Sequence, residues 1–286
     1  MALQSIADQL LACGYQFFSN EKQWIHALSK HLGVKRFKRF EEQVNAVQSG
    51  HLAGRNLYDT LYKLEDFTLV LSRDLGTLIQ VYDSLLKAIS NHSQFREGWV
   101  IDLGCGIAPL HGFMSRELEI NLIGVDTSGN ALIHASDLNP QSRFYLWDYQ
   151  KSPCLDLPKL HSGFCVFGVD FQSLSEMPPE GVNQFAPYLS RQSQYHLQRK
   201  EEAYQIWENW DPSFERGAVF IQILRMAWFD HFVAWVEVAQ ELDWRIQTLS
   251  WIQTDEERFP QIQWIKDELT AEWGIKEMIF HWGREI

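Results

Sequence analysis

Apolar residues in the first third of the chain recur every three or four positions, which is the spacing of one helix face. This pattern is clear from Leu3 to Leu11 and again from Leu75 to Leu85. Gly50 and Gly54 interrupt it, because glycine is a weak helix former. The sequence therefore predicts an N-terminal helical region over residues 1–95, with a junction to the rest of the chain just before Gly98.

After Gly98 short apolar runs alternate with helical stretches, which is typical of βαβ units. The predicted strands are Trp99 to Leu103, Asn121 to Asp126, Phe144 to Asp148, Gly163 to Val169 and Ala218 to Leu224. The helices predicted between them are Pro109 to Leu118, Gly129 to Leu138 and Ser193 to Asn209. Parallel strands need crossover helices, so we expect an α/β fold: a doubly wound, mostly parallel, Rossmann-like sheet covered on both faces.

The end of the chain is less regular. A helix from Trp228 to Leu242 and a strand from Trp244 to Ile252 are predicted. Gln261 to Ile265 could pair antiparallel with that strand, whereas Glu268 to Trp282 fits a helix and a strand equally well. The fold of the last 25 residues or so therefore stays open.

The connection between the fourth and fifth predicted strands is long for a compact fold. Its first half contains Pro178, Pro179 and Pro187, which exclude a continuous helix, whereas Tyr195 to Trp210 can form one. We expect this insertion, about residues 171–213, to act as a lid. The expected organisation is a helical substrate or lid region over 1–95 and a core over 96–286 that contains the insertion.

A strand, a glycine-rich turn and a helix follow one another from Val100 to Pro109. Gly104 and Gly106 allow a sharp turn and a close approach to a ligand, and Pro109 suits the first turn of a helix. Doubly wound sheets bind ligands at this carboxyl end of a strand. A dinucleotide-binding turn would carry a third glycine at position 109, so an NAD-dependent oxidoreductase is disfavoured. His111 is expected to be an ordinary helix residue.

The segment Asp102-Leu103-Gly104-Cys105-Gly106 resembles the first motif of class I S-adenosylmethionine-dependent methyltransferases. That family usually has a third glycine where this chain has Ala108, a small residue that we expect to keep the turn. The resemblance covers roughly residues 96–255, and its specific part lies around the first three strands. It implies S-adenosylmethionine as the cofactor and S-adenosylhomocysteine as its product.

The resemblance also implies a role for the acid at the end of the second strand. Asp126, followed by Thr127, is similar to the family residue that accepts hydrogen bonds from both ribose hydroxyls. Hydrogen bonds to an ionised carboxylate are stronger than neutral ones, which favours Asp over Asn at this point. The alternative is that Asp126 caps the helix that starts near Ser128.

The third and fourth strands end in further candidates. Asp148 resembles the family acid that accepts from the adenine amino group, at an interval after Asp126 that successive βα units require. One of the neighbouring aromatic residues, Trp147 or Tyr149, could pack on the adenine ring. The alternative is that both are ordinary core residues. Gly168 and Asp170 resemble the segment beside the methionine part of the cofactor.

Methyl transfer is an in-line displacement at a sulfonium carbon, so positioning supplies much of the catalysis and a general base is optional. A hydroxyl acceptor would often need one. The candidates are Glu176, Tyr195 and His196 in the insertion and His231 after the fifth strand, since these regions are expected to overhang the cofactor. Arg225 orients an anionic substrate or forms a surface ion pair.

The charge balance narrows the choice of partner. The net charge of −12 at pH 7 disfavours binding to a nucleic-acid phosphate backbone. The basic run from Lys35 to Arg39 is an exception, and it is either a solvated helix end or a site for a phosphate, a carrier protein or a nucleic acid. The 12 Trp, 18 Phe and 9 Tyr are either core residues or the lining of an aromatic pocket.

The remaining sequence features mainly exclude classes. Four cysteines without a CxxC pair and the lack of a secretory leader predict a reduced, cytoplasmic setting, and no apolar run is long enough for a membrane span. No metal site is expected, because His161 and Cys165 form a single pair rather than a ligand set. Hydrolase and kinase motifs are absent, as is the Asn-Pro-Pro-Tyr type tetrapeptide associated with methylation of amide or base nitrogens.

Together these features predict a methyltransferase that acts on an oxygen or nitrogen of a small molecule, such as an amino-acid-derived or other specialised metabolite. We expect no nucleic-acid or membrane partner, and both a monomer and a homodimer remain open. One alternative is a methyltransferase for a protein or carrier-bound substrate, which is favoured if the basic run from Lys35 to Arg39 faces the active-site mouth. Another is a noncatalytic binding module that keeps the fold.

Overall fold

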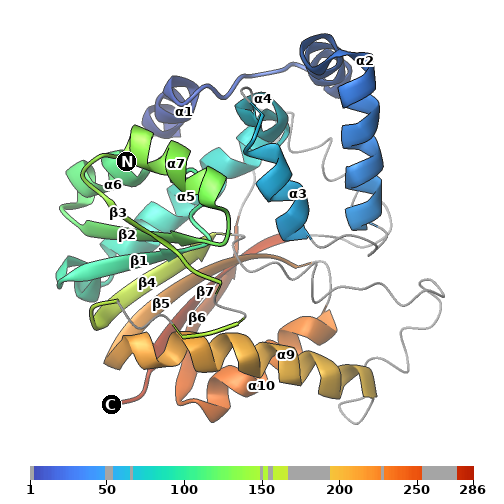
Figure 1. Ribbon diagram of the computed structural model, residues 1–286. Coiled ribbons are helices and arrows are strands. Elements are labelled where there is room, and N and C mark those ends of the chain that lie inside the picture. Colours follow the sequence, from blue (N-terminus) through green and yellow to red (C-terminus); the bar gives the residue numbers. More distant parts are fainter. Residues whose placement is uncertain are drawn as a thin grey trace.

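The computed structural model describes residues 3–48, 54–64, 67–148, 151–153, 157–166, 194–226, 229–252 and 276–286. Its centre is a seven-stranded sheet with the strand order β3-β2-β1-β4-β5-β7-β6 (Figure 1). The strands are β1 (Trp99–Leu103), β2 (Asn121–Asp126), β3 (Arg143–Leu146), β4 (Leu160–Val166), β5 (Phe214–Met226), β6 (Trp244–Trp251) and β7 (Lys276–Arg284).

The neighbouring strands from β3 to β5 are all parallel, whereas β7 is antiparallel to both β5 and β6. The predicted α/β fold with a doubly wound, mostly parallel sheet is confirmed. The strand order reverses beside β1, which has β2 on one side and β4 on the other. In such sheets this switch point is the usual ligand site. Residues 276–284 form a strand, and Gln261 to Ile265 lie outside the described residues.

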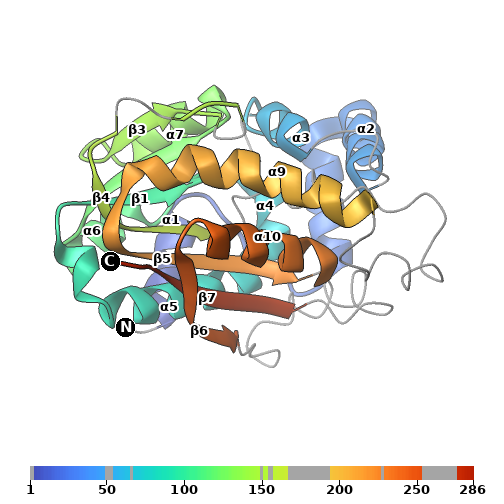
Figure 2. The same cartoon turned by 90° about the horizontal axis from the view of Figure 1, so that it is seen from below.

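Helices cover both faces of the sheet (Figures 1 and 2). The upper layer of Figure 1 contains α1, α5, α6 and α7, and the lower layer contains α9 and α10. The helices are α1 (Leu3–Ala12), α2 (Glu21–Gln48), α3 (Gly54–Leu61), α4 (Phe67–Leu71), α5 (Leu75–Ser90), α6 (His111–Leu118), α7 (Gly129–Leu138), α9 (Gln194–Trp210) and α10 (Phe229–Glu241). Short 3-10 helices span Ser72–Asp74, Ser93–Arg96 and Asp211–Ser213.

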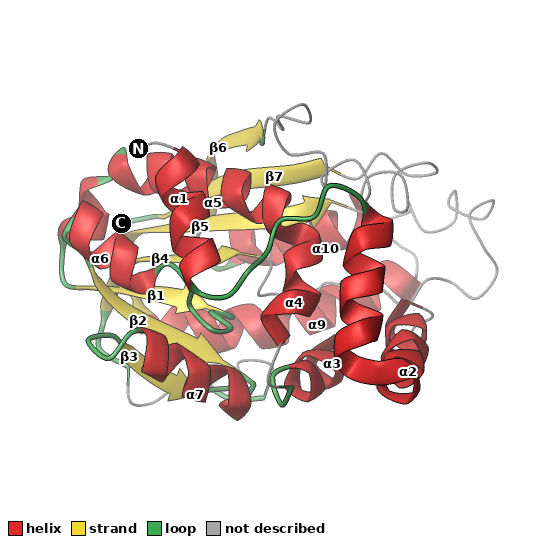
Figure 3. Ribbon diagram, turned by 90° about the horizontal axis from the view of Figure 1, so that it is seen from above, coloured by secondary structure: helices red, strands yellow, loops and turns green. Residues whose placement is uncertain are grey.

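The N-terminal helices pack directly on the sheet. Leu75, Ile79 and Leu85 on one face of α5 are completely buried, in the same apolar cluster as Val219 and Ile221 of β5. The periodicity that predicts this helix therefore describes the face that it turns to the sheet. Figure 3 shows α1, α5, α6 and α7 lying over the strands from above.

Tryptophan fills the opposite face of the sheet. Trp207 and Trp210 of α9, Trp235 of α10, Trp244 of β6 and Trp282 of β7 are each at most 1% exposed. The Trp207 ring centroid lies 5.0 to 5.7 Å from those of the other four. These tryptophans are therefore core residues and do not line an aromatic pocket.

A buried glutamine accepts hydrogen bonds from two tryptophans of this core. Gln222 of β5 is completely buried, and its Oε1 accepts hydrogen bonds from Trp235 Nε1 at 2.9 Å and Trp282 Nε1 at 3.2 Å. Two indole N–H groups would otherwise lose their hydrogen bonds in an apolar core, which costs about 1–3 kcal/mol for each. Gln222 thus allows tryptophans from a helix and a strand to share the core.

Two histidines join the end of α5 to the sheet. His92 Nε2 and His281 Nδ1 lie 2.9 Å apart, and burial lowers the pKa of both rings below the ordinary value. An unfolded histidine takes up a proton at about pH 6.5, whereas the buried rings take one up only at lower pH. Between these pH values the unfolded chain binds more protons than the folded chain, so the stability falls as the pH drops. We expect His92→Gln to flatten the pH dependence of unfolding between about pH 7 and 5.

This expectation is checked by urea unfolding at several pH values. His26→Gln is the matched control, since His26 is exposed on α2. Equal pH slopes for wild type and His92→Gln would show that the histidine pair does not contribute.

Candidate functional site

The glycine turn after β1 has an unusual backbone. Gly104, Gly106 and Ala108 all have positive φ angles, of 74°, 53° and 48°. Glycine adopts this region freely, whereas alanine is disfavoured there by about 1–2 kcal/mol. The N–H groups of Gly104 and Cys105 donate to the carbonyl oxygen of Val125 at 2.8 and 3.0 Å. The turn is thus tied to the end of β2, and the expectation that Ala108 keeps it is confirmed.

Asp126, at the end of β2, is hydrogen-bonded to this turn. Its Oδ2 accepts from the Gly106 N–H at 2.9 Å, and its Oδ1 accepts from the Ser128 N–H at 2.8 Å. Burial raises the pKa of Asp126, while these backbone bonds act in the opposite direction. The side chain is partly exposed, so it is not closed off by these bonds. The carboxylate is therefore oriented by backbone N–H groups and still accessible to a ligand.

The N-cap of α7 is Ser128 rather than Asp126. The Ser128 hydroxyl accepts from the Ala131 N–H at 3.3 Å, which is the usual N-cap bond. The same hydroxyl donates to Asp59 of α3 at 2.9 Å. Asp126 is therefore not the helix cap. Its carboxylate instead links Gly106 of the glycine turn to Ser128, the residue before α7.

Cys105 contributes its backbone to the turn and its side chain to the core. The thiol is buried in a cluster with Ala108, Leu132 and Ala135, and burial raises its pKa well above the ordinary value. A Cβ atom on Gly124 of β2 would lie 2.8 Å from this sulfur. Glycine at position 124 therefore makes room for the side chain beneath the turn.

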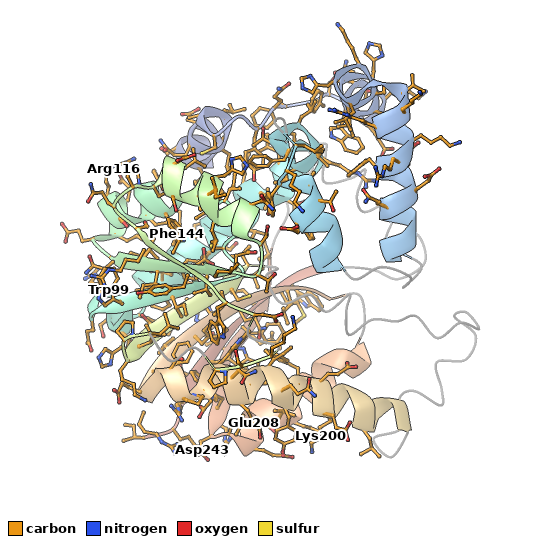
Figure 4. All side chains as sticks on the ribbon, in the orientation of Figure 1. Trp99, Arg116, Phe144, Lys200, Glu208 and Asp243 are labelled. Atoms are coloured by element: carbon orange, nitrogen blue, oxygen red, sulfur yellow. The ribbon has the colours of Figure 1, made fainter. Side chains whose placement is uncertain are left out.

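Asp102 and His111 form a buried pair behind the turn. Asp102 Oδ2 lies 2.8 Å from His111 Nε2, and their side chains are 9% and 2% exposed. Burial raises the pKa of Asp102, and the bond to His111 opposes that shift. The imidazole stacks on Phe144, which is labelled in Figure 4. His111 is thus a buried partner of Asp102 rather than an ordinary helix residue, and a cofactor contact by Asp102 stays a prediction.

The helix after the turn starts later than the sequence predicts. α6 begins at His111, so Pro109 lies in the turn itself. Asn139, which follows α7, explains how this turn is held: its Nδ2 donates to the Ala108 carbonyl and its Oδ1 accepts from the Gly112 N–H, both at 2.8 Å. No local pattern singles out Asn139, because its partners precede it by about 30 positions.

The candidates near β3 separate into core and surface. Trp147 is 5% exposed, joins the tryptophan core and donates from Nε1 to the Ser152 carbonyl, so the plain-core interpretation holds for it. Asp148 is half-buried and forms an ion pair with Lys151 at 2.6 Å. Thr127 is exposed beside Asp126.

Other sequence candidates are not placed by the structure. Tyr149, Gly168, Asp170 and Glu176 lie outside the described residues. Tyr195 and His196 occupy the first turn of α9, and His231 lies in α10, but their side chains are not described. The roles of these residues in catalysis or cofactor binding stay predictions.

The basic run lies in the second half of α2, after a break at Gly33, where φ is 71°. Lys35, Arg36, Lys38 and Arg39 are all exposed, and none forms an ion pair with another residue that the structure describes. This half of α2 stands beside α3 in Figures 1 and 3. Within the described ranges no three His, Cys, Asp or Glu side chains gather as metal ligands, and no helix there is long and apolar enough to span a membrane.

Comparisons with known proteins find only solved structures of low sequence identity to this chain. No protein-family model matches the chain, and a search of curated proteins finds no match. One similar solved structure is a magnesium protoporphyrin IX methyltransferase from Synechocystis PCC 6803 with bound SAM, at 13% identity over 92% of this chain and 97% of that one, with a TM-score of 0.44.

Two further solved structures are also methyltransferases. An O-methyltransferase of a trans-AT PKS multienzyme from Brevibacillus brevis, in complex with S-adenosyl-L-homocysteine, is 12% identical over 82% of this chain and 80% of that one, with a TM-score of 0.45. A geranyl diphosphate methyltransferase is 8% identical over 74% and 82%, with a TM-score of 0.46. At such low identities and with TM-scores below 0.5, the function has to be inferred from the residues of this chain.

Proposed function

We propose that this protein is an S-adenosylmethionine-dependent methyltransferase that transfers a methyl group to an oxygen or nitrogen of a small molecule in the cytoplasm. The observation that carries the proposal is the Asp126 carboxylate, which the Gly106 and Ser128 N–H groups orient at the switch point of the sheet. A carboxylate beside two positive-φ glycines suits a ligand with a vicinal diol that lies close to the backbone.

The residues of the turn fit this donor. Gly104 and Gly106 present no side chain to it, Asp126 would accept from the two ribose hydroxyls, and Asp148 would accept from the adenine amino group after releasing Lys151. When bound, S-adenosylmethionine supplies an electrophilic methyl group on a sulfonium. What the protein adds is position and the exclusion of water, which are large terms in a displacement of this kind.

Two features support a small molecule as the methyl acceptor: the net charge of the chain and the segments that could enclose the site. A net charge of −12 disfavours the binding of polyanionic acceptors. The helices before β1 and the predicted insertion at about 171–213 provide the chain needed to enclose a small acceptor beside the donor. Glu176, Tyr195, His196 and His231 remain the candidates for a base if the acceptor is a hydroxyl.

Calorimetry with S-adenosylhomocysteine and with NADH tests the donor. We expect the first to bind and the second not to, because the turn lacks the third glycine that packs a helix against a pyrophosphate. Binding of NADH alone, or of neither ligand, would overturn the proposal. Methyl transfer to a metabolite panel with hydroxyl and amine acceptors then tests turnover, and donor binding without turnover on any acceptor would favour a noncatalytic module.

A second candidate, a methyltransferase for a carrier-bound or protein substrate, is favoured by the position of α2. The exposed cations lie on the second half of α2, and α2 contacts α3. Asp59 of α3 in turn accepts a hydrogen bond from Ser128, which is next to Thr127. In that case reversing Lys35 and Arg36 to glutamate would raise the KM for an acidic, carrier-bound acceptor and leave the KM for the free acceptor unchanged. An equal effect on both acceptors would count against it.

A further inference from the structure

Tyr62, directly after α3, lies over the glycine turn. Its side chain is buried, and its hydroxyl oxygen lies 2.8 Å from the place where a Cβ atom on Gly106 would be. Position 106 therefore needs glycine for two reasons: its φ angle is positive, and the Tyr62 hydroxyl occupies the space of a side chain. A group from the N-terminal helices thus reaches the backbone that the proposed donor would approach.

Polar contacts hold Tyr62 at this place. Asp59, about one helical turn earlier, accepts through Oδ1 from the Ser128 hydroxyl at 2.9 Å and from Asn130 Nδ2 at 3.0 Å. His134 of α7 donates from Nε2 to the Tyr62 carbonyl at 3.0 Å. The segment is therefore fastened at two points to α7, the helix that follows Asp126.

An aromatic contact completes the anchor. The Tyr62 ring meets the Phe67 ring edge-on, with centroids 5.5 Å apart, and Phe67 in turn packs on His134 at 4.6 Å. Edge-to-face ring pairs of this kind contribute about 0.5–1.5 kcal/mol beyond the area that they bury. The phenol of Tyr62 is thus held between the aromatic contacts on one side and the turn on the other.

The surroundings keep this phenol protonated. Burial raises the pKa of Tyr62 well above its ordinary value, and the nearby Asp126 carboxylate and Tyr15 add to the shift. A protonated phenol both donates and accepts a hydrogen bond. It can therefore serve either a carboxylate or an ammonium group, both of which S-adenosylmethionine carries.

We propose that Tyr62 binds the methyl donor directly, through a hydrogen bond from its hydroxyl beside Gly106, and that Asp59 is a positioning residue that holds α3 in place for this contact. The inference rests on the proposed function. It gives part of the helical region over 1–95 a specific role, in which α3 covers the donor and shields the transferable methyl group from water.

The direct test is Tyr62→Phe, which removes only the hydroxyl. By calorimetry we expect S-adenosylhomocysteine to bind about tenfold more weakly, the usual effect of one lost hydrogen bond. Without ligand the melting temperature should stay close to that of the wild type. Tyr204→Phe is the matched control, because it removes a phenol hydroxyl from α9 on the other face of the sheet.

The role of Asp59 is tested through Tyr62. Asp59→Ala should weaken S-adenosylhomocysteine binding several-fold, and Asp59→Asn should restore most of it, since asparagine keeps an oxygen for Ser128 and Asn130. If Asp59 acts by positioning Tyr62, the double variant Asp59→Ala/Tyr62→Phe should bind little worse than Tyr62→Phe. Additive losses, or a lack of rescue by asparagine, would contradict the positioning role.

The outcomes separate this inference from the proposed function. Wild-type affinity in Tyr62→Phe, together with loss of binding in Asp126→Ala, would overturn the inference and leave the proposed function standing. A lower melting temperature of ligand-free Tyr62→Phe with unchanged affinity would assign Tyr62 to packing alone, which also overturns it. If wild type, Tyr62→Phe and Tyr204→Phe all fail to bind, both proposals are wrong.

Discussion

Asp126→Ala is expected to weaken S-adenosylhomocysteine binding by about 100-fold or more, because two charge-assisted hydrogen bonds of about 1.5–3 kcal/mol each are lost. The same change frees the Gly106 and Ser128 N–H groups, so the turn also loses the contact that orients it. Both effects act at the donor site, and calorimetry measures them together.

Two variants sharpen this result. Asp126→Asn keeps one acceptor oxygen and should retain part of the affinity. Asp137→Ala removes an exposed carboxylate from the last turn of α7 and should bind like the wild type. Unchanged affinity in Asp126→Ala, with a circular dichroism spectrum like that of the wild type, would remove the main support for the methyltransferase proposal.

Trp207→Ala is expected to lower the free energy of unfolding by about 3–5 kcal/mol, the range for removing a large buried aromatic side chain. Trp207 is 1% exposed and stands among four other tryptophans that α9, α10, β6 and β7 supply. Its removal leaves a cavity where these elements meet, because neighbouring rings on a sheet and two helices cannot all move into the space. Urea unfolding followed by circular dichroism measures the loss.

Trp251→Ala is the control for this prediction. Trp251 ends β6 and is 54% exposed, so its removal should change stability by about 0.5 kcal/mol or less. A loss of under about 1 kcal/mol for Trp207→Ala would show that the face of the sheet under α9 relaxes around the gap. The donor site lies on β1 and β2, so the folded fraction of Trp207→Ala should still bind S-adenosylhomocysteine.

Features that depend on short stretches of chain could be predicted from the sequence. The βαβ alternation follows from the spacing of apolar residues, and the sharp turn follows from the freedom of Gly104 and Gly106, so both are visible in a few consecutive residues. The family resemblance points to Asp126, because this acid at the end of the second strand matches a family position. The structure adds that its two bonds go to the N–H groups of Gly106 and Ser128.

Features that depend on which distant segments meet could not be predicted. Asp59 lies on α3 and Tyr62 directly after it, and only the docking of α3 on α7 brings them to Ser128 and Gly106. The same holds for His111, whose burial against Asp102 and Phe144 is decided by how α6 packs on the sheet. A polar side chain has the same sequence signature whether it faces water or a buried partner.

The sequence by itself thus determined the layered α/β fold and the glycine turn, because helix and strand periodicity and glycine conformation are local properties, and its resemblance to a known family singled out Asp126. The tertiary structure alone decided that β7 lies between β5 and β6, that tryptophans from α9, α10, β6 and β7 share one core, and that Tyr62 covers the turn. These depend on the burial of apolar surface between elements far apart in the chain, which no short stretch of residues encodes.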